Sequence, residues 1–309
     1  MSNNKQANGK LDNFYQSQKL PMSVRAIQLY FKRIGWMFPR QSAKLFWKLF
    51  TTPRNRKIKD WQQDFLDSAA VADTFIIDGL EYKTYSWGNG PKTVLMLHGW
   101  EGMTVDFKKM IDALLEEGEY RIISFDFPGH GTAEGSHSSL VAFMKGTKQI
   151  LRKLKTVHAV IGHSLGASAS FFSLAELNKE VKTEHLVMLG SYPIPFHFFR
   201  TFQNFMEIPQ PLFEKCVDYA EDLVNMNIRG YNMYEMRYNI PAQSVLMIHD
   251  IHDEVADIEK AKALAAEWEG TDILVGDHGG HFKHFRHPEV VQRVVEQLKQ
   301  HESAALSLH

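Results

Sequence analysis

The sequence predicts an α/β protein whose mostly parallel central sheet is covered by helices on both faces. Three observations support this fold class. From Thr74 onward, short apolar runs alternate with longer stretches at helical spacing. The runs are apolar throughout, which is typical of strands buried on both faces of a parallel sheet. Finally, Ser164 lies between two glycines where a predicted strand turns into a predicted helix.

The elements follow along the chain in a regular order. The first two strands form a hairpin that turns through Gly79, and the remaining strands alternate with helices. The predicted strands cover residues 74–78, 82–88, 92–99, 121–129, 157–162, 185–192, 244–250 and 271–277. The predicted helices cover residues 105–117, 139–154, 165–177, 258–268 and 288–298.

One segment, residues 193–243, interrupts this alternation. It carries five prolines and ten aromatic residues, and it is too long for a simple connection. We predict that it forms a small helical lid inserted in the sheet domain. The core would then comprise residues 74–192 and 244–300, followed by a C-terminal tail over residues 301–309.

The region before the core has two parts. Residues 1–21 form a polar N-terminal arm without the apolar core of a signal peptide. Residues 22–73 are predicted to be a helical extension, and within them the stretch 22–59 carries ten basic residues, no acidic residue and seven aromatic rings. This composition favours helices packed on the main domain with their cations in water. It leaves open peripheral contact of residues 22–59 with an anionic membrane.

Composition limits the class of protein. The 309 residues are 44% hydrophobic and 23% charged, with a net charge of -1, which is typical of a soluble globular protein and argues against a nucleic-acid binder. A single cysteine, Cys216, excludes an internal disulfide and suits a reducing compartment. No apolar run is long enough to span a membrane. We therefore expect a cytoplasmic protein, with peripheral membrane contact left open.

The stretch GHSLG around Ser164 indicates a nucleophile. A serine in a tight strand-to-helix turn needs small residues two positions away on each side, and Gly162 and Gly166 meet that need. Because a serine hydroxyl is a weak nucleophile, the hypothesis requires a base, an acid that orients the base, and donors for an oxyanion.

Residues 248–257 supply the candidate acid. They follow a predicted strand and contain four carboxylates. We favour Asp253, which lies in the loop shortly before Val255, a residue that can pack back on the core. Asp250, at the strand end itself, is the second candidate.

The candidate base comes from residues 276–290, where histidines recur every third position. We favour His281, because it follows a Gly-Gly pair that would let the backbone approach the serine. His278 is the weaker candidate. Histidines at this spacing could instead bind zinc, but the H-E-x-x-H pattern is absent, and we expect no native metal site.

Backbone amides are the expected oxyanion donors. Trp100 follows the predicted strand that ends in LMLHG, and Leu165 begins the helix after the serine. We predict that the N–H groups of Trp100 and Leu165 form the oxyanion hole.

Five segments together resemble the α/β-hydrolase superfamily, in its serine esterase and lipase branch. They are LHGWEG (97–102), FDFPGHG (125–131), GHSLGA (162–167), HDEVAD (252–257) and GGHF (279–282). The resemblance covers about residues 75–298. It implies an α/β-hydrolase fold with a helical lid and an N-terminal extension outside the shared core. It also implies that Ser164 is the nucleophile, His281 the base and Asp253 the acid, that the Trp100 and Leu165 amides form the oxyanion hole, and that His130 is structural.

The chain departs from this pattern at the acid loop, HDIHD, where family members often have a glycine near the position of Asp250. The nucleophile also separates relatives, since haloalkane dehalogenases and epoxide hydrolases of this fold use an aspartate where this chain has Ser164.

The expected function is hydrolysis of carboxylic esters through an acyl-enzyme on Ser164, without a cofactor. The aromatic lid indicates a small-molecule ester with an apolar acyl or alcohol group. A thioesterase or an amidase would use the same residues. The sequence also leaves open a membrane-surface lipase docked through the basic aromatic segment, and a non-catalytic ligand-binding protein on this fold.

Overall fold

The computed structural model describes residues 20–54 and 57–306. They form two compact units, and each is considered by itself. The larger unit contains residues Pro53–Pro193 and everything described after Asn232, and the smaller unit contains residues up to Thr52 together with Ile194–Asn232. The predicted polar arm over residues 1–21 lies, except for its last two residues, outside the described residues.

An eight-stranded sheet organises the larger unit, with strand order β1-β2-β4-β3-β5-β6-β7-β8. β1 and β2 are antiparallel, as are β2 and β4, and all other neighbours are parallel. The predicted hairpin is present, since β1 and β2 pair up to Ile77 and Leu80. Asp78 and Gly79 form the two-residue turn between them, and both have the positive φ values that suit such a turn. The strands are β1 (Ala70–Ile77), β2 (Leu80–Trp87), β3 (Lys92–Leu97), β4 (Tyr120–Phe125), β5 (Thr156–His163), β6 (Lys182–Leu189), β7 (Ser244–Asp250) and β8 (Thr271–Gly276).

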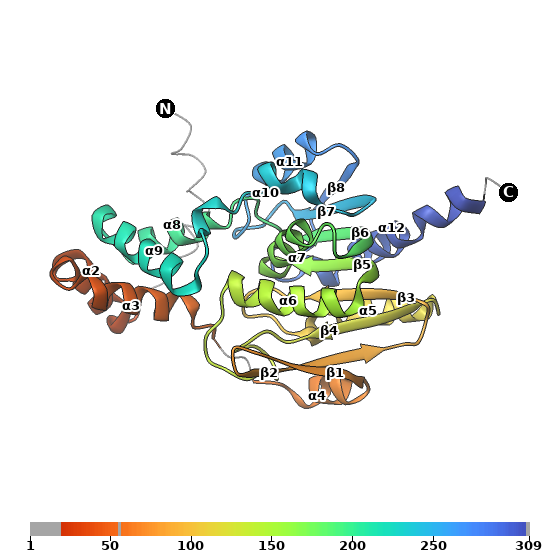
Figure 1. Ribbon diagram of the computed structural model, residues 1–309, viewed down its shortest axis with the longest axis horizontal. Helices are drawn as coiled ribbons and strands as arrows, with labels where there is room; N and C mark the ends of the chain where they lie inside the picture. Colours follow the sequence, from red (N-terminus) through yellow and green to blue (C-terminus); the bar gives the residue numbers. More distant parts are fainter. Residues whose placement is uncertain (1–19, 55–56, 307–309) are drawn as a thin grey trace. The chain divides into compact units, whose positions relative to one another are not determined.

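Helices cover both faces of the sheet, which explains the continuous apolar runs in its central strands (Figure 1). Val94 and Met96 of β3 face one layer, together with α5 and α12. Leu95 and Leu97 point to the opposite face and are equally buried. The helices are α4 (Asp60–Asp67), α5 (Lys108–Glu116), α6 (Leu140–Leu154), α7 (Leu165–Glu176), α10 (Met233–Met236), α11 (Ile258–Glu267) and α12 (Pro288–Leu306), with single 3₁₀ turns η2 (Thr104–Phe107), η4 (Arg237–Asn239) and η5 (His284–Arg286).

The smaller unit is entirely helical. Its core joins two distant parts of the chain, because α3 lies along α9 (Figure 1). The ring of Phe46 in α3 stacks on that of Phe50 and contacts the rings of Phe199 and Phe213. The unit comprises α2 (Met22–Arg33), η1 (Gly35–Met37), α3 (Pro39–Thr51), α8 (Phe196–Phe205), α9 (Gln210–Val224) and η3 (Ile228–Gly230).

Several boundaries differ from the sequence-based expectation. The predicted extension and lid are not separate pieces, because residues up to Thr52 and Ile194–Asn232 share one core. α4 and the start of β1 belong to the sheet unit, since Ala70 pairs with Ser86 four residues before the expected boundary at Thr74. At the other end, α12 continues to Leu306, into the predicted tail over residues 301–309.

No helix within residues 20–54 and 57–306 is both long enough and apolar enough to cross a lipid bilayer.

Candidate active site

Ser164 stands between β5 and α7 in a strained backbone conformation, with φ of 52° and ψ of −115°. A positive φ is unusual for a residue with a side chain and occurs where the surrounding structure enforces it. The two flanking glycines show that enforcement. A Cβ on Gly162 would lie 2.5 Å from the Ala167 Cα, and one on Gly166 would lie 2.2 Å from the Leu97 carbonyl oxygen. The turn therefore tolerates no side chain at either position.

This geometry predicts a large cost for Gly166→Ala. The new methyl group would overlap the backbone carbonyls of Leu97, the last residue of β3, and of His98, which cannot rotate away, so we expect a loss of about 3 kcal/mol or more in the free energy of unfolding. Gly270→Ala is the control, because nothing lies within 4 Å of its Cβ position and its φ is +77°. Only backbone strain of about 1 kcal/mol is expected there. Urea denaturation of both variants checks the difference, and equal losses would contradict it.

His281 lies in the loop after β8, between Ser164 and Asp253. Gly279 and Gly280 both adopt positive φ values and carry the backbone toward the serine. The His281 Nε2 is 2.9 Å from the Ser164 Oγ, and its Nδ1 is 2.7 Å from the Asp253 Oδ2. The structure thus brings together the three side chains that the sequence predicted as nucleophile, base and acid.

Asp253 accepts hydrogen bonds on both carboxylate oxygens. The amides of Val255 and Ala256 donate to Oδ1 at 2.8 and 2.7 Å, and the His281 ring donates to Oδ2. Burial raises the pKa of this carboxyl, but the hydrogen bond from His281, the charges of His281 and His249 and the Ala256 amide together outweigh that effect, and the pKa lies below its usual value. Asp253 is therefore ionised and oriented toward His281.

Asp250, the second candidate acid, has different partners. Its Oδ1 accepts from the His252 amide at 2.7 Å and its Oδ2 from the His278 amide at 2.5 Å. Burial raises its pKa, and the backbone hydrogen bonds from Gly280, His252 and His278 lower it further than burial raises it. These contacts tie the loop after β7 to the loop that carries His281. The Nε2 of His278, the second candidate base, lies 3.3 Å from the Glu289 Oε2, whereas the contact with the Ser164 Oγ is made by His281.

The two predicted oxyanion donors lie on segments that meet at Ser164. Leu165 is the first residue of α7, and Trp100 follows Gly99, where a Cβ would be 2.9 Å from the Ser164 Cβ. Within the described part of the chain, neither the Trp100 nor the Leu165 amide donates a hydrogen bond to another protein group. Their role as an oxyanion hole stays a prediction.

His98 fixes the loop that carries Trp100. The Phe127 amide donates to the His98 Nε2 at 3.0 Å, so the proton of the neutral ring is on Nδ1. That N–H donates to the Gly99 carbonyl at 2.8 Å. The imidazole therefore bridges the loops after β3 and β4. His130, expected to be structural, is buried against the rings of His98 and Trp100.

Two further histidines, His163 and His284, surround the base and had no assigned role from sequence. The His163 Nε2–H donates to the His281 carbonyl at 2.9 Å, and the His284 Nδ1–H donates to the Gly280 carbonyl at 3.2 Å. Both rings are buried. His163 directly precedes the serine, and His284 lies two residues after the GGHF motif, but only the folded chain shows that their rings hold the backbone of the base.

Burial of these rings predicts acid sensitivity. Burial, and then the neighbouring His281, lower the pKa of His284 from 6.5 to about 4, and the pKa of His163 is lowered for the same reasons. The unfolded chain binds protons first as the pH falls, so the free energy of unfolding should decrease between pH 6.5 and about 4, by roughly 3 kcal/mol from His284 alone.

Denaturation curves across this pH range check the prediction, with His284→Asn as the test variant. Asn can still donate to the Gly280 carbonyl but does not titrate, so the pH slope should become shallower. His137→Asn is the control, because the His137 ring is exposed in the folded protein. An unchanged slope in His284→Asn would contradict the assignment.

The histidine-rich loop was also a candidate for zinc binding. Two groups within the described residues have side-chain ligand atoms within 4.8 Å of one another, His158 with Glu184 and His185, and His278 with His287 and Glu289. Neither includes Ser164, Asp253 or His281. The arrangement around Ser164 needs no metal to account for its contacts.

Apolar surface adjoins the site. Phe282, the residue after the base, is 55% exposed, and its ring centre lies 5.0 Å from that of His281. Two open clefts around Gly88–Pro91 lie instead at the amino end of β3, whereas Ser164 follows the carboxyl end of the neighbouring strand β5. Phe282 therefore marks where an apolar group could rest beside the serine.

Comparison with known proteins agrees with this architecture. The family model of the alpha/beta hydrolase fold matches residues 92–216. No curated protein sequence gives a significant match to the chain.

Several solved structures are similar. The Pyrococcus furiosus esterase Pf2001 is 21% identical, with a TM-score of 0.59 over 81% of this chain and 96% of its own. Est1E from Butyrivibrio proteoclasticus, solved with ferulic acid, is 15% identical, with a TM-score of 0.56 over 76% of this chain and 100% of its own. The thioesterase domain of the curacin biosynthetic pathway is 16% identical, with a TM-score of 0.53 over 75% of this chain and 99% of its own. From its sheet order, its family match over residues 92–216 and these structural likenesses, the chain has the α/β-hydrolase fold.

Proposed function

We propose that the protein is a serine hydrolase that cleaves carboxylic esters through an acyl-enzyme on Ser164. One observation carries the proposal. A single imidazole, His281, lies within hydrogen-bond distance of both a strained serine and a buried, ionised carboxylate. That arrangement activates a serine for attack on a carbonyl carbon.

The reaction would proceed in two steps. The Ser164 Oγ attacks the ester carbonyl while its proton passes to the His281 Nε2, and the amides of Trp100 and Leu165 bind the oxyanion. When the intermediate collapses, the alcohol leaves with the proton from His281. Water, deprotonated by the same Nε2, then attacks the acyl-enzyme, and the carboxylic acid is released as Ser164 regains its proton.

Asp253 supports both steps without changing its own protonation. Its Oδ2 accepts from the His281 Nδ1–H, which keeps the lone pair of Nε2 directed at Ser164. The carboxylate also stabilises the imidazolium that forms in each step. The backbone donors of Val255 and Ala256 hold it in place.

The proposed substrate is a small ester with an apolar acyl or alcohol group, and the proposal assigns the protein no nucleic-acid partner and no cofactor. The exposed Phe282 ring beside His281 supports the apolar group. The esterases similar in fold are in keeping with this chemistry. The single buried thiol, Cys216, suits a reducing compartment, and we propose the cytoplasm.

The test is kcat/KM on p-nitrophenyl esters from acetate to palmitate, with Ser164→Ala from the same preparation as the background. We expect hydrolysis that depends on Ser164 and that rises with acyl length up to the length that the apolar surface beside His281 can contact. A parallel series of acyl thioesters and anilides separates esterase from thioesterase and amidase activity. Absence of turnover on all three, together with no labelling of Ser164 by a fluorophosphonate, would exclude a serine hydrolase.

The apolar surface gives a separate prediction. Phe282→Ser should leave hydrolysis of the acetate nearly unchanged and lower kcat/KM for a longer ester by about tenfold, because contact with the acyl chain is lost. Ile76→Ser is the control, because it removes another exposed apolar side chain, on β1. An equal loss on both esters would show that Phe282 supports His281 and does not contact the acyl chain.

A further inference from the structure

The first helices of the smaller unit divide their side chains between a core and an exposed face. In α2, Phe31 is buried, and Val24, Ile27 and Gln28 lie on the same side at helical spacing. In α3, Ala43 and Phe46 are buried in the core formed with α9. Phe31 and Phe46 therefore serve the core of the smaller unit, and their presence needs no external partner.

A second set of large apolar side chains is exposed around the turn between α2 and α3. Trp36 is 66% exposed and Met37 57%, and the Trp36 indole N–H donates to the Arg33 carbonyl. That hydrogen bond turns the indole back along the end of α2. We call this set the Trp36 patch, and it consists of Leu29, Ile34, Trp36, Met37 and Phe38.

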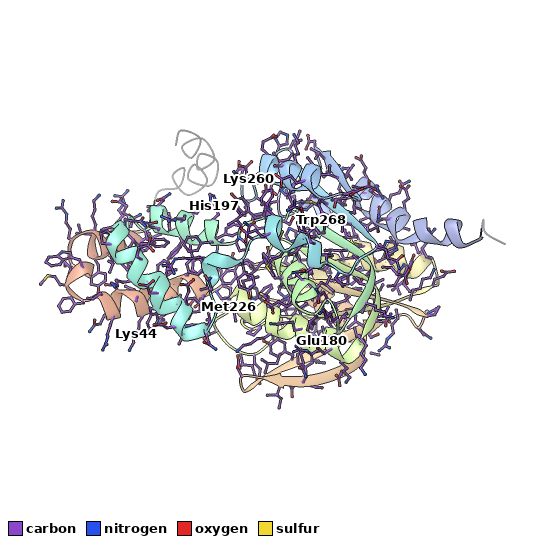
Figure 2. All side chains as sticks on the ribbon, turned by 45° about the horizontal axis from the view of Figure 1, so that its top comes forward. Lys44, Glu180, His197, Met226, Lys260 and Trp268 are labelled. Carbon is purple, nitrogen blue, oxygen red and sulfur yellow. The ribbon has the colours of Figure 1, made fainter. Side chains whose placement is uncertain are left out.

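Cations border this patch. Residues 20–52 contain six basic residues and no acidic residue. All six are exposed, and Lys32 pairs with Glu207. In the described part of the chain, the other five form no ion pair with a carboxylate, and Figure 2 labels one of them, Lys44, on the outer side of α3. They are Arg25, Arg33, Arg40, Lys44 and Lys48.

The acids of the smaller unit do not neutralise these cations. Glu214, Asp218 and Glu221 follow one another along the exposed side of α9, and all three bind Arg229. The buried side of α9, with Leu212, Phe213 and Val217, faces the core shared with α3. The charge of α2 and α3 is thus available to an external anion.

We propose that the Trp36 patch and its flanking cations dock the protein on the surface of an anionic phospholipid membrane. Tryptophan and phenylalanine partition into the headgroup region, and exposed lysines and arginines are attracted to an anionic leaflet. Leu29, Ile34 and Met37 have no aromatic face on which a nucleobase could stack, so the combination suits lipid better than nucleic acid. The proposal does not depend on the activity of Ser164.

The experiment is co-sedimentation of the full chain with vesicles of phosphatidylcholine alone or of phosphatidylcholine with phosphatidylserine. We expect the protein to pellet with the anionic vesicles only, and added salt should weaken the binding. Trp36→Ser combined with Phe38→Ser should lower the partition coefficient by about tenfold or more, since insertion into the headgroup region is lost. Arg40→Gln, Lys44→Gln and Lys48→Gln together should lower it at least as much.

Matched variants on the sheet unit control for general effects. Trp61→Ser removes another half-exposed tryptophan, and Lys109→Gln with Lys179→Gln removes exposed lysines outside the patch. These should pellet like the parent. Because every altered side chain is exposed, circular dichroism and thermal melting should show all variants folded, and hydrolysis of a soluble ester can be followed separately.

Several results would overturn the proposal. Equal pelleting with neutral and anionic vesicles would remove its electrostatic part, and failure to pellet with either would end it. A lipid-free dimer that Trp36→Ser with Phe38→Ser dissociates would show that a second copy of the chain covers the patch. Binding to single-stranded DNA without binding to anionic vesicles would assign the cations to a nucleic acid.

Discussion

Ser164→Ala should reduce kcat on any ester that the protein hydrolyses by at least about 10⁴-fold, while the protein remains folded. The Oγ is the only atom removed, and it is the atom that would form the acyl-enzyme. His281 would keep its hydrogen bond to Asp253, and the strained backbone at position 164 would keep its φ of 52°, which alanine adopts as poorly as serine. Substrate affinity should change little, because the binding surface is intact.

Ser168→Ala is the matched control for this variant. Ser168 is buried on α7, one helical turn after Ser164, and the side-chain hydrogen bonds that join Ser164, His281 and Asp253 do not involve it. Its kcat should stay within a few-fold of the parent. A fluorophosphonate should label the parent and Ser168→Ala at position 164 and leave Ser164→Ala unlabelled. Residual activity of Ser164→Ala above about one part in a hundred would point to another nucleophile.

Local sequence patterns were sufficient for the fold and for the composition of the candidate site. Continuous apolar runs revealed the buried strands, and the order of elements indicated a mostly parallel sheet. Because the carboxyl ends of parallel strands meet at one edge, residues after β5, β7 and β8 could be expected to converge there. Ser164, Asp253 and His281 do so. The glycine spacing around Ser164 reflects a steric requirement that the structure makes explicit.

Contacts between distant segments were beyond such patterns. The hydrogen bond from His163 to the His281 carbonyl joins residues 118 apart in the chain. Nothing in the local sequence shows that α3 would pair with α9, or that Ala70 would extend β1. The aromatic residues of α2 and α3 illustrate the same limit. Their spacing is compatible with a core or with an exposed surface, and tertiary packing assigns Phe46 to the first and Trp36 to the second.

Asp253→Asn and Asp250→Asn should separate the two candidate acids. In Asp253→Asn, the amide oxygen can still accept from Val255 and Ala256, so folding should be retained. The new NH₂ group would face the His281 Nδ1 and donate to it. That places the ring proton on Nε2, where the lone pair is needed to accept the proton of Ser164. We expect kcat to fall by about 10⁴-fold with little change in the melting temperature.

Asp250→Asn should show the reverse pattern. Asn has one accepting oxygen where Asp250 uses two, so either the part-buried amide of His252 or the buried amide of His278 would lose its acceptor. Leaving such a group unpaired costs about 1–3 kcal/mol, which should appear as a lower midpoint of denaturation. The bond between His281 and Asp253 remains, and kcat of the folded fraction should stay within about tenfold of the parent. If Asp250→Asn instead abolished turnover while Asp253→Asn only destabilised the protein, the acid of the proposed mechanism would be Asp250, and the contact between Asp253 and His281 would be structural.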